Sequence, residues 1–108
     1  MADVVTNNPL KSTVALAALQ QVMDPEIGLN IVDLGLVYQI DFDEDLKKLF
    51  CTMTLTTQFC PMGESITDAA KEILKETFPE YEIAFNLTFN PPWNHDLISA
   101  EGKKFLNR

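Results

Sequence analysis

Three segments in which apolar and polar residues alternate constrain the fold of this chain more than any other feature. They are residues 34–42 (LGLVYQIDF), 49–57 (LFCTMTLTT) and 81–89 (YEIAFNLTF). A period of two is typical of strands that bury one face and leave the other in water. The short polar link at 43–48 predicts that the first two strands form an antiparallel hairpin.

Helical periodicity precedes, separates and follows these strands. A first helix is expected from Ser12, with Val14, Ala18 and Val22 at four-residue steps and a stop at Pro25. A second is expected over residues 61–77, and a short third from Asp96 or Ser99 to Leu106. The apolar stripe of the second helix consists of Met62, Ile66, Ala69, Ala70, Ile73 and Leu74.

The predicted fold is a two-layer α+β domain with the order α-β-β-α-β-α. Its small mixed sheet has three strands, and because each strand is apolar on one face, helices should cover one face of the sheet. The length of 108 residues suits one domain. We expect residues 1–11 to be a flexible N-terminal segment and residues 12–108 to form this domain.

The chain is strongly acidic, with a formal net charge of −8. Such a surface repels phosphate, so we expect neither nucleic acid nor an anionic membrane as a partner. We see no secretory signal pattern and no apolar stretch that approaches a membrane span, which predicts a cytoplasmic protein with reduced thiols.

Cys60 is the leading candidate for chemistry. Pro61 suits the first position of a helix, which would make Cys60 the N-cap, close to free N–H groups and the positive end of the helix dipole. That setting favours the thiolate, the form that binds metal or attacks carbon. Gly63 adds a place where the backbone can approach a ligand. The alternative is that Cys60 is a plain cap or a packed small residue.

Cys51 shares a strand face with apolar residues and is expected in the core. At about 3.3 Å per strand residue, Cys60 should lie about 20 Å or more from it, whereas a disulfide needs Cα atoms within about 7 Å. One chain therefore offers one good soft ligand. A four-ligand zinc or iron–sulfur site would need a second chain, a partner or a small thiol.

Other candidates have structural alternatives of equal or greater weight. Acids in the loop 24–33 could transfer protons or simply stabilise turns, and threonines before Cys60 could bind a ligand or only favour a strand. Trp93 could anchor a partner or cover the end of the core. The full set of supporting or partner-binding candidates is Asp24, Glu26, Asp33, Thr54, Thr56, Thr57, Gly63, Trp93 and Asp96.

Three blocks together carry a family resemblance. MDPEIGLNIVDLGLVY (23–38), MTLTTQFCPMG (53–63) and NPPWNHDLIS (90–99) resemble, in order and spacing, the signature blocks of the SufT- and PaaD-like iron–sulfur assembly proteins. The resemblance covers roughly residues 12–107. The chain lacks a PaaD-type cysteine-rich zinc tail, which favours the stand-alone SufT-like form.

The resemblance implies a domain of the iron–sulfur cluster assembly type, related to the C-terminal domain of NifU scaffolds, and an accessory rather than enzymatic role in maturing iron–sulfur proteins. The family's reactive cysteine matches Cys60, its acidic loop matches Asp24, Glu26 and Asp33, and its aromatic block matches Trp93 and Asp96. NifU relatives use a CxxC pair where this chain has only Cys60. A cluster is therefore expected only transiently, shared with a second chain, a scaffold or a client protein, and a homodimer is compatible with this.

Two alternatives come from other classes. A thiol enzyme with Cys60 as nucleophile would need a base within about 3 Å, and His95 is the obvious choice. A plain interaction module would have a structural Cys60, and Cys60→Ser would then leave maturation unchanged.

Overall fold

The computed structural model describes residues 4–24, 27–56, 63–90 and 92–106. Four strands form the main sheet in the order β1-β4-β5-β6, with β4 and β5 antiparallel and both outer pairs parallel. The short strands β2 and β3 pair as a separate hairpin. In chain order the elements are β1 (Val5–Thr6), α1 (Pro9–Leu19), β2 (Met23–Asp24), β3 (Leu29–Asn30), β4 (Val37–Asp43), β5 (Lys48–Met53), α2 (Gly63–Thr77), β6 (Glu82–Leu87), the 3₁₀ turn η1 (His95–Leu97) and α3 (Ala100–Leu106).

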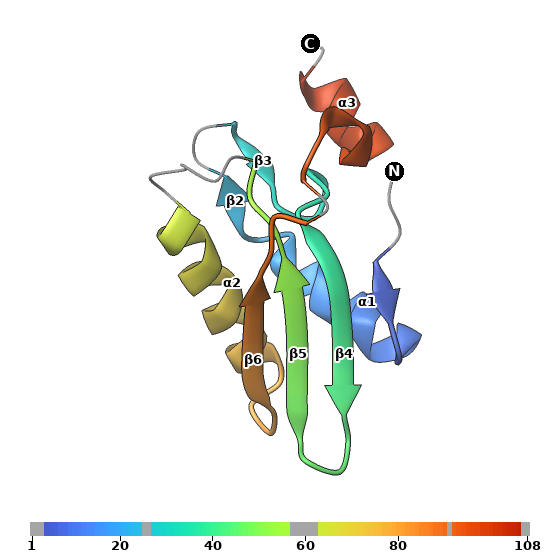
Figure 1. The fold of residues 1–108 in the computed structure, drawn as a ribbon, viewed down its shortest axis with the longest axis vertical. Helices are drawn as coiled ribbons and strands as arrows, with labels where there is room; N and C mark the ends of the chain where they lie inside the picture. The colour runs from blue at the N-terminus through green and yellow to red at the C-terminus, as the bar shows by residue number, and fades with distance from the viewer. Residues whose placement is uncertain (1–3, 25–26, 57–62, 91, 107–108) are drawn as a thin grey trace.

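The predicted α+β class with a mixed sheet is confirmed. Figure 1 shows α1 and α2 behind the sheet, the opposite face open toward the viewer, and α3 beyond one end of the strands. Each of the three predicted strands is present, and the sheet gains a fourth because Val5 and Thr6 pair with Gln39 and Ile40 of β4. A two-residue strand has no periodicity to reveal it in the sequence.

The N-terminal helix begins earlier than the sequence pattern indicates. Its N-cap is Asn8, whose side chain accepts a hydrogen bond of 3.1 Å from the Lys11 N–H, and Pro9 occupies the first turn. The predicted start at Ser12 was wrong, and the segment 1–11 predicted to be flexible contains β1 and the first turn of α1. Val14 is 48% exposed, because the helix turns Ala15, Ala18 and Leu19 toward the core instead.

A bulge in β4 alters the predicted strand faces. The register with β5 shifts between Val37 and Gln39, so that Val37 and Ile40 are both buried. Tyr38, which strict alternation places on the buried face, is half-exposed as a result. Partial burial raises the pKa of its hydroxyl, opposed by a hydrogen bond with Thr54.

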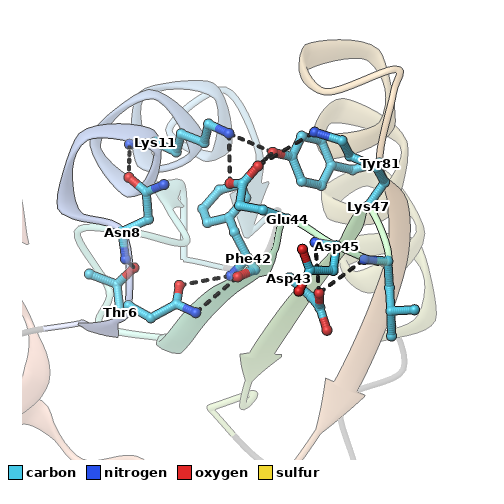
Figure 2. A network of polar contacts seen from close by, with 11 residues as sticks. Thr6, Asn8, Lys11, Phe42, Asp43, Glu44, Asp45, Lys47 and Tyr81 are labelled. Atoms are coloured by element: carbon cyan, nitrogen blue, oxygen red, sulfur yellow. Dashed lines mark hydrogen bonds and ion pairs between the residues drawn. The ribbon is translucent and has the colours of Figure 1, made fainter.

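A polar network, drawn in Figure 2, closes one end of the sheet and lies next to an aromatic cluster. Lys11 in α1 donates to Glu44 at 2.7 Å and to the Tyr81 hydroxyl at 2.5 Å, and Tyr81 donates to Glu44 at 2.7 Å. Hydrogen bonds from Lys11 and then Tyr81 lower the pKa of Glu44 to about 2. The rings of Phe42, Phe78 and Tyr81 meet edge to face beneath these groups. The network ties α1 to the β4–β5 turn and to the residue before β6.

Within the described residues, no helix is both long enough and apolar enough to span a membrane.

Candidate functional site

Cys60 and Thr57 belong to the connection between β5 and α2, and Glu26 to the connection between β2 and β3; all three lie outside the described residues. Their predicted roles, including that of Cys60 as a helix cap, stay predictions. Gly63 is the first residue of α2. The other candidates, Asp24, Asp33, Thr54, Thr56, Trp93 and Asp96, are described and can be placed.

Asp33 joins the β3 end of the domain to the C-terminal helix. Its carboxylate accepts hydrogen bonds from the Asn30 side-chain amide at 2.7 Å and from the Ser99 hydroxyl at 2.8 Å. Its carbonyl oxygen accepts the Ser99 N–H at 2.8 Å. The Ser99 hydroxyl in turn accepts the Gly102 N–H at 3.0 Å, which caps α3. These contacts give Asp33 a structural role, because its carboxylate holds the Ser99 hydroxyl that caps α3.

Asp24 is almost fully buried in the turn that closes the β2–β3 hairpin. Only 2% of its surface is exposed, and its carboxylate accepts the Ile27 N–H at 3.3 Å. Its carbonyl oxygen accepts the N–H of Gly28, which has a positive φ of 80°. This is turn chemistry, which the sequence offered as the alternative to a catalytic acid.

The two described threonines of the TTQFC block differ in exposure. Thr54 is fully buried, its N–H donates to the Leu36 carbonyl at 2.8 Å, and its hydroxyl makes a 3.4 Å contact with the Leu55 carbonyl. Thr56, the last described residue before Cys60, is half-exposed. Of these two hydroxyls, only that of Thr56 can meet a ligand without local opening.

Trp93 covers the end of the core. It is half-buried against the buried cluster, and its indole N–H donates to the carbonyl oxygen of Leu34 at 2.6 Å. Asp96 is exposed in η1, where its N–H donates to the Asn94 side chain at 2.8 Å. The Trp93 geometry favours the covering role over a free aromatic anchor.

Gly35 explains how the segment after β6 lies so close to the start of β4. It has a φ of 78°, and a Cβ built on it would lie 2.2 Å from the Leu97 carbonyl oxygen. Sequence reasoning missed this role, as it missed Asn30 and Ser99. The one available signal was a glycine within an alternating strand pattern, which often marks close backbone approach.

The structure places Cys51 in the core. Cys51 is 1% exposed in β5, and burial raises the pKa of its thiol to about 12. It is a core residue, as predicted, and not a metal ligand. Among the described residues, no group of three or more His, Cys, Asp or Glu side chains is placed to hold a metal ion.

The described candidates thus gather at the end of the sheet from which the chain enters the Cys60 connection. Asp33, Trp93 and Ser99 fix the segments 29–36 and 92–102 against each other, and Thr54 bonds to Leu36 between them. This arrangement, a mixed sheet with helices on one face and a cysteine-bearing connection at one end, suits the small domain of the iron–sulfur assembly type that the sequence resemblance implies.

Comparison with known proteins supports this class. Residues 12–84 match the family described as iron–sulfur cluster assembly protein, and the chain belongs to that family. It is 42% identical over 88 residues to the Fe-S protein maturation auxiliary factor YitW of Bacillus subtilis, covering 82% of this chain and 85% of the relative. It is 42% identical over 84 residues to the Fe-S protein maturation auxiliary factor SufT of Staphylococcus aureus, covering 76% and 92%.

A solved structure shows the same fold. The crystal structure of a domain of unknown function, DUF59, from Bacillus anthracis superposes with a TM-score of 0.84 at 37% identity. The match covers 93% of this chain and 98% of that one. The resemblance to SufT-like proteins seen in the sequence is therefore confirmed.

Proposed function

We propose that this protein is an accessory factor in the maturation of iron–sulfur proteins and is not itself an enzyme. The observation that carries the proposal is the identity of 42% to two proteins named as Fe-S protein maturation auxiliary factors, each matched over at least 85% of its length. A shared role is better supported by this than by fold alone.

Cys60 is the residue we propose to act on the cluster or on a partner. The chain has two cysteines, and the deeply buried Cys51, with its pKa near 12, offers no accessible thiolate. The sequence places Cys60 three residues before the start of α2, where the helix dipole favours a thiolate. A single thiol cannot complete the coordination of a cluster, so the cluster is cargo, held transiently together with ligands from a scaffold, a client or a second chain.

The partners we propose are iron–sulfur scaffold and client proteins in the cytoplasm. The net charge of −8 suits protein surfaces with basic patches and opposes contact with nucleic acid or anionic membranes. The segments held together by Asp33 and Trp93 give such a partner a firm surface beside the Cys60 connection.

The test is a replacement in cells. The chromosomal copy is exchanged for Cys60→Ala, and the activities of several iron–sulfur enzymes are measured beside enzymes that contain no cluster. We expect the first group to fall and the second to stay constant. The matched control is Cys51→Ala, which removes the other thiol and should retain maturation once protein levels are equalised.

Three results would contradict the proposal. Equal loss in both groups of enzymes would indicate a general defect rather than a maturation role. Full maturation by Cys60→Ala would leave only the interaction-module interpretation. If the purified protein turned over a thiol-reactive substrate, with activity lost in His95→Gln as well as Cys60→Ala, the thiol-enzyme alternative would replace the accessory role.

A further inference from the structure

A groove runs along α2 on the side that faces β2. It has a volume of about 440 Å³, and its floor is apolar, formed by Val22, Met23, Ile66, Ala69 and Ile73. Met23 of β2 is 50% exposed, although it is a large apolar residue. Between Ser65 and Glu76, both of which line it, α2 rises roughly 16 Å. This is room for two to three turns of a docked helix.

The charges around this groove are of one sign. Glu72 and Glu76 line it, and among the described residues that form it there is no basic side chain. The lysines of α2, Lys71 and Lys75, line a neighbouring hollow toward β6, which shares Glu72 with this groove. An occupant of the groove should therefore present apolar side chains together with positive charge.

The chain itself carries a segment of that chemistry in α3. Lys103 and Lys104 are exposed in its last turn, and next to them Phe105 is 41% and Leu106 is 40% exposed. These are two of the chain's eight basic residues and two of its larger exposed apolar side chains, brought together on seven residues that span about 10 Å.

This helix is held away from the groove of its own chain. Gly102 packs on Ile98 and on Leu29 of β3, and the bonds between Ser99 and Asp33 fix the start of α3 at that position. The groove lies on the other side of the same hairpin, beside Met23 of β2. Figure 1 shows the β2–β3 hairpin between α2 and α3. Only a second copy can place an α3 in this groove.

We infer that the chain forms a two-fold dimer in which α3 of each copy, through Lys103 and Leu106 on one face of the helix, docks in the groove beside Glu72 and Glu76 of the other. Because groove and helix flank one hairpin, a two-fold axis close to the hairpin makes the two contacts reciprocal. The net charge of −8 per chain opposes association at long range. The contact therefore depends on these facing opposite charges and on the apolar area that they enclose. The inference does not depend on the proposed function.

The test uses charge reversal in the full-length chain without a C-terminal tag, with mass followed by sedimentation equilibrium over a wide range of protein concentration. In one variant, K103E/K104E, helix and groove are both acidic; in the other, E72K/E76K, both are basic. Each should raise the dimer dissociation constant roughly a hundredfold or more, since like charges then face each other. The control, K71E/K75E, changes the net charge as much as K103E/K104E but in the neighbouring hollow, at side chains that do not line the groove, and should dimerise far better than K103E/K104E.

Mixing the two variants gives the decisive result. In a mixed dimer, the basic groove of one chain meets the acidic helix of the other, and the acidic groove meets the basic helix, so both contacts regain opposite charges. We expect the equimolar mixture to dimerise where neither variant does alone. A wild-type chain that stays monomeric at every concentration, a dimer that K103E/K104E does not weaken, or a mixture that stays monomeric would each overturn the inference. A wild-type chain that stays monomeric while its groove binds segments of other proteins would also overturn the inference.

Discussion

Asp33 and Ser99, 66 positions apart in the chain, are joined by two hydrogen bonds of 2.8 Å, one between side chains and one between backbone groups. The same Ser99 hydroxyl caps α3 by accepting the Gly102 N–H. Asp33 therefore stabilises the C-terminal helix α3 through Ser99, the residue that caps this helix. A residue that the family resemblance places in an acidic functional loop has a clear structural task in this fold.

Asp33→Ala should destabilise the domain by about 1–3 kcal/mol, because the part-buried amide of Asn30 and hydroxyl of Ser99 both lose their acceptor. The loss is measured by urea unfolding. Hydrogen exchange should accelerate first at the Gly102 and Lys103 amides, which bond to Ser99.

Asp96→Ala is the matched control, since this exposed carboxylate stands in the neighbouring segment and a surface change there should stay within about 0.5 kcal/mol. Equal effects of the two substitutions would show that Asp33 does not hold α3.

Gly35→Ala should be far more harmful than Gly28→Ala, although both glycines have a φ near 80°. A Cβ at Gly35 would lie 2.2 Å from the Leu97 carbonyl oxygen, whereas nothing lies within 4 Å of one at Gly28. The backbone cost alone is about 1–2 kcal/mol, and the clash should bring Gly35→Ala to about 3 kcal/mol or more. Urea midpoints measured side by side compare the two, and equal midpoints would contradict the close approach of the two segments.

The longer helices and strands could be predicted because each leaves a local pattern. Cys51 and Leu49 were placed in the core by alternation, and both are buried. Strand β1 could not be predicted, since two residues show no period and their pairing depends on Gln39 and Ile40, more than thirty positions later. The bulge at Val37 was hidden for a related reason: it is a property of the pairing between β4 and β5, not of either strand alone.

The site was predicted only in part, because contacts between residues close in the chain leave a local sequence pattern and contacts between distant residues do not. The turn role of Asp24 follows from short-range Asx chemistry and was visible in the sequence as an alternative. The bonds of Asp33 to Ser99 and of Trp93 to Leu34 span 66 and 59 positions. Only the folded chain reveals which distant groups satisfy these polar atoms.

Trp93→Phe should cost about 0.5–1.5 kcal/mol, because it preserves an aromatic ring over the core but removes the donor to the Leu34 carbonyl. Trp93→Ala should cost about 3 kcal/mol or more, since it also removes the apolar cover from the core. Thermal or urea unfolding of the pair separates the two contributions. If Trp93→Phe were as harmful as Trp93→Ala, packing would not be the main contribution of the ring.

Acid should weaken the network of Lys11, Glu44 and Tyr81, which closes the end of the sheet opposite the Cys60 connection. Hydrogen bonds from Lys11 and Tyr81 lower the pKa of Glu44 from 4.5 to about 2. Since the folded state then binds the proton less readily than the unfolded state, the stabilisation is complete above pH 4.5 and is lost as the pH falls through about 2. Urea unfolding at a series of acidic pH values measures the loss, which salt should reduce because Glu44 is solvent-exposed.

Glu44→Gln isolates this contribution. Glutamine cannot ionise, so the variant should lack the part of the acid-induced loss that belongs to this group, while remaining less stable than wild type at neutral pH. An unchanged pH profile in Glu44→Gln would mean that the acid sensitivity arises from other carboxylates of this acidic chain.

Thiol labelling should distinguish the two cysteines without reference to any cellular role. At about pH 8 the buried Cys51, with a pKa near 12, is almost entirely protonated and shielded, so it should react with an alkylating reagent only after unfolding. We predict one modified thiol per native chain, two in denaturant, and none in native Cys60→Ser. Mass spectrometry counts the additions directly. A native Cys60→Ser chain that is labelled as fast as wild type would show that Cys51 is the accessible thiol, and the argument that assigns the chemistry to Cys60 would then fail.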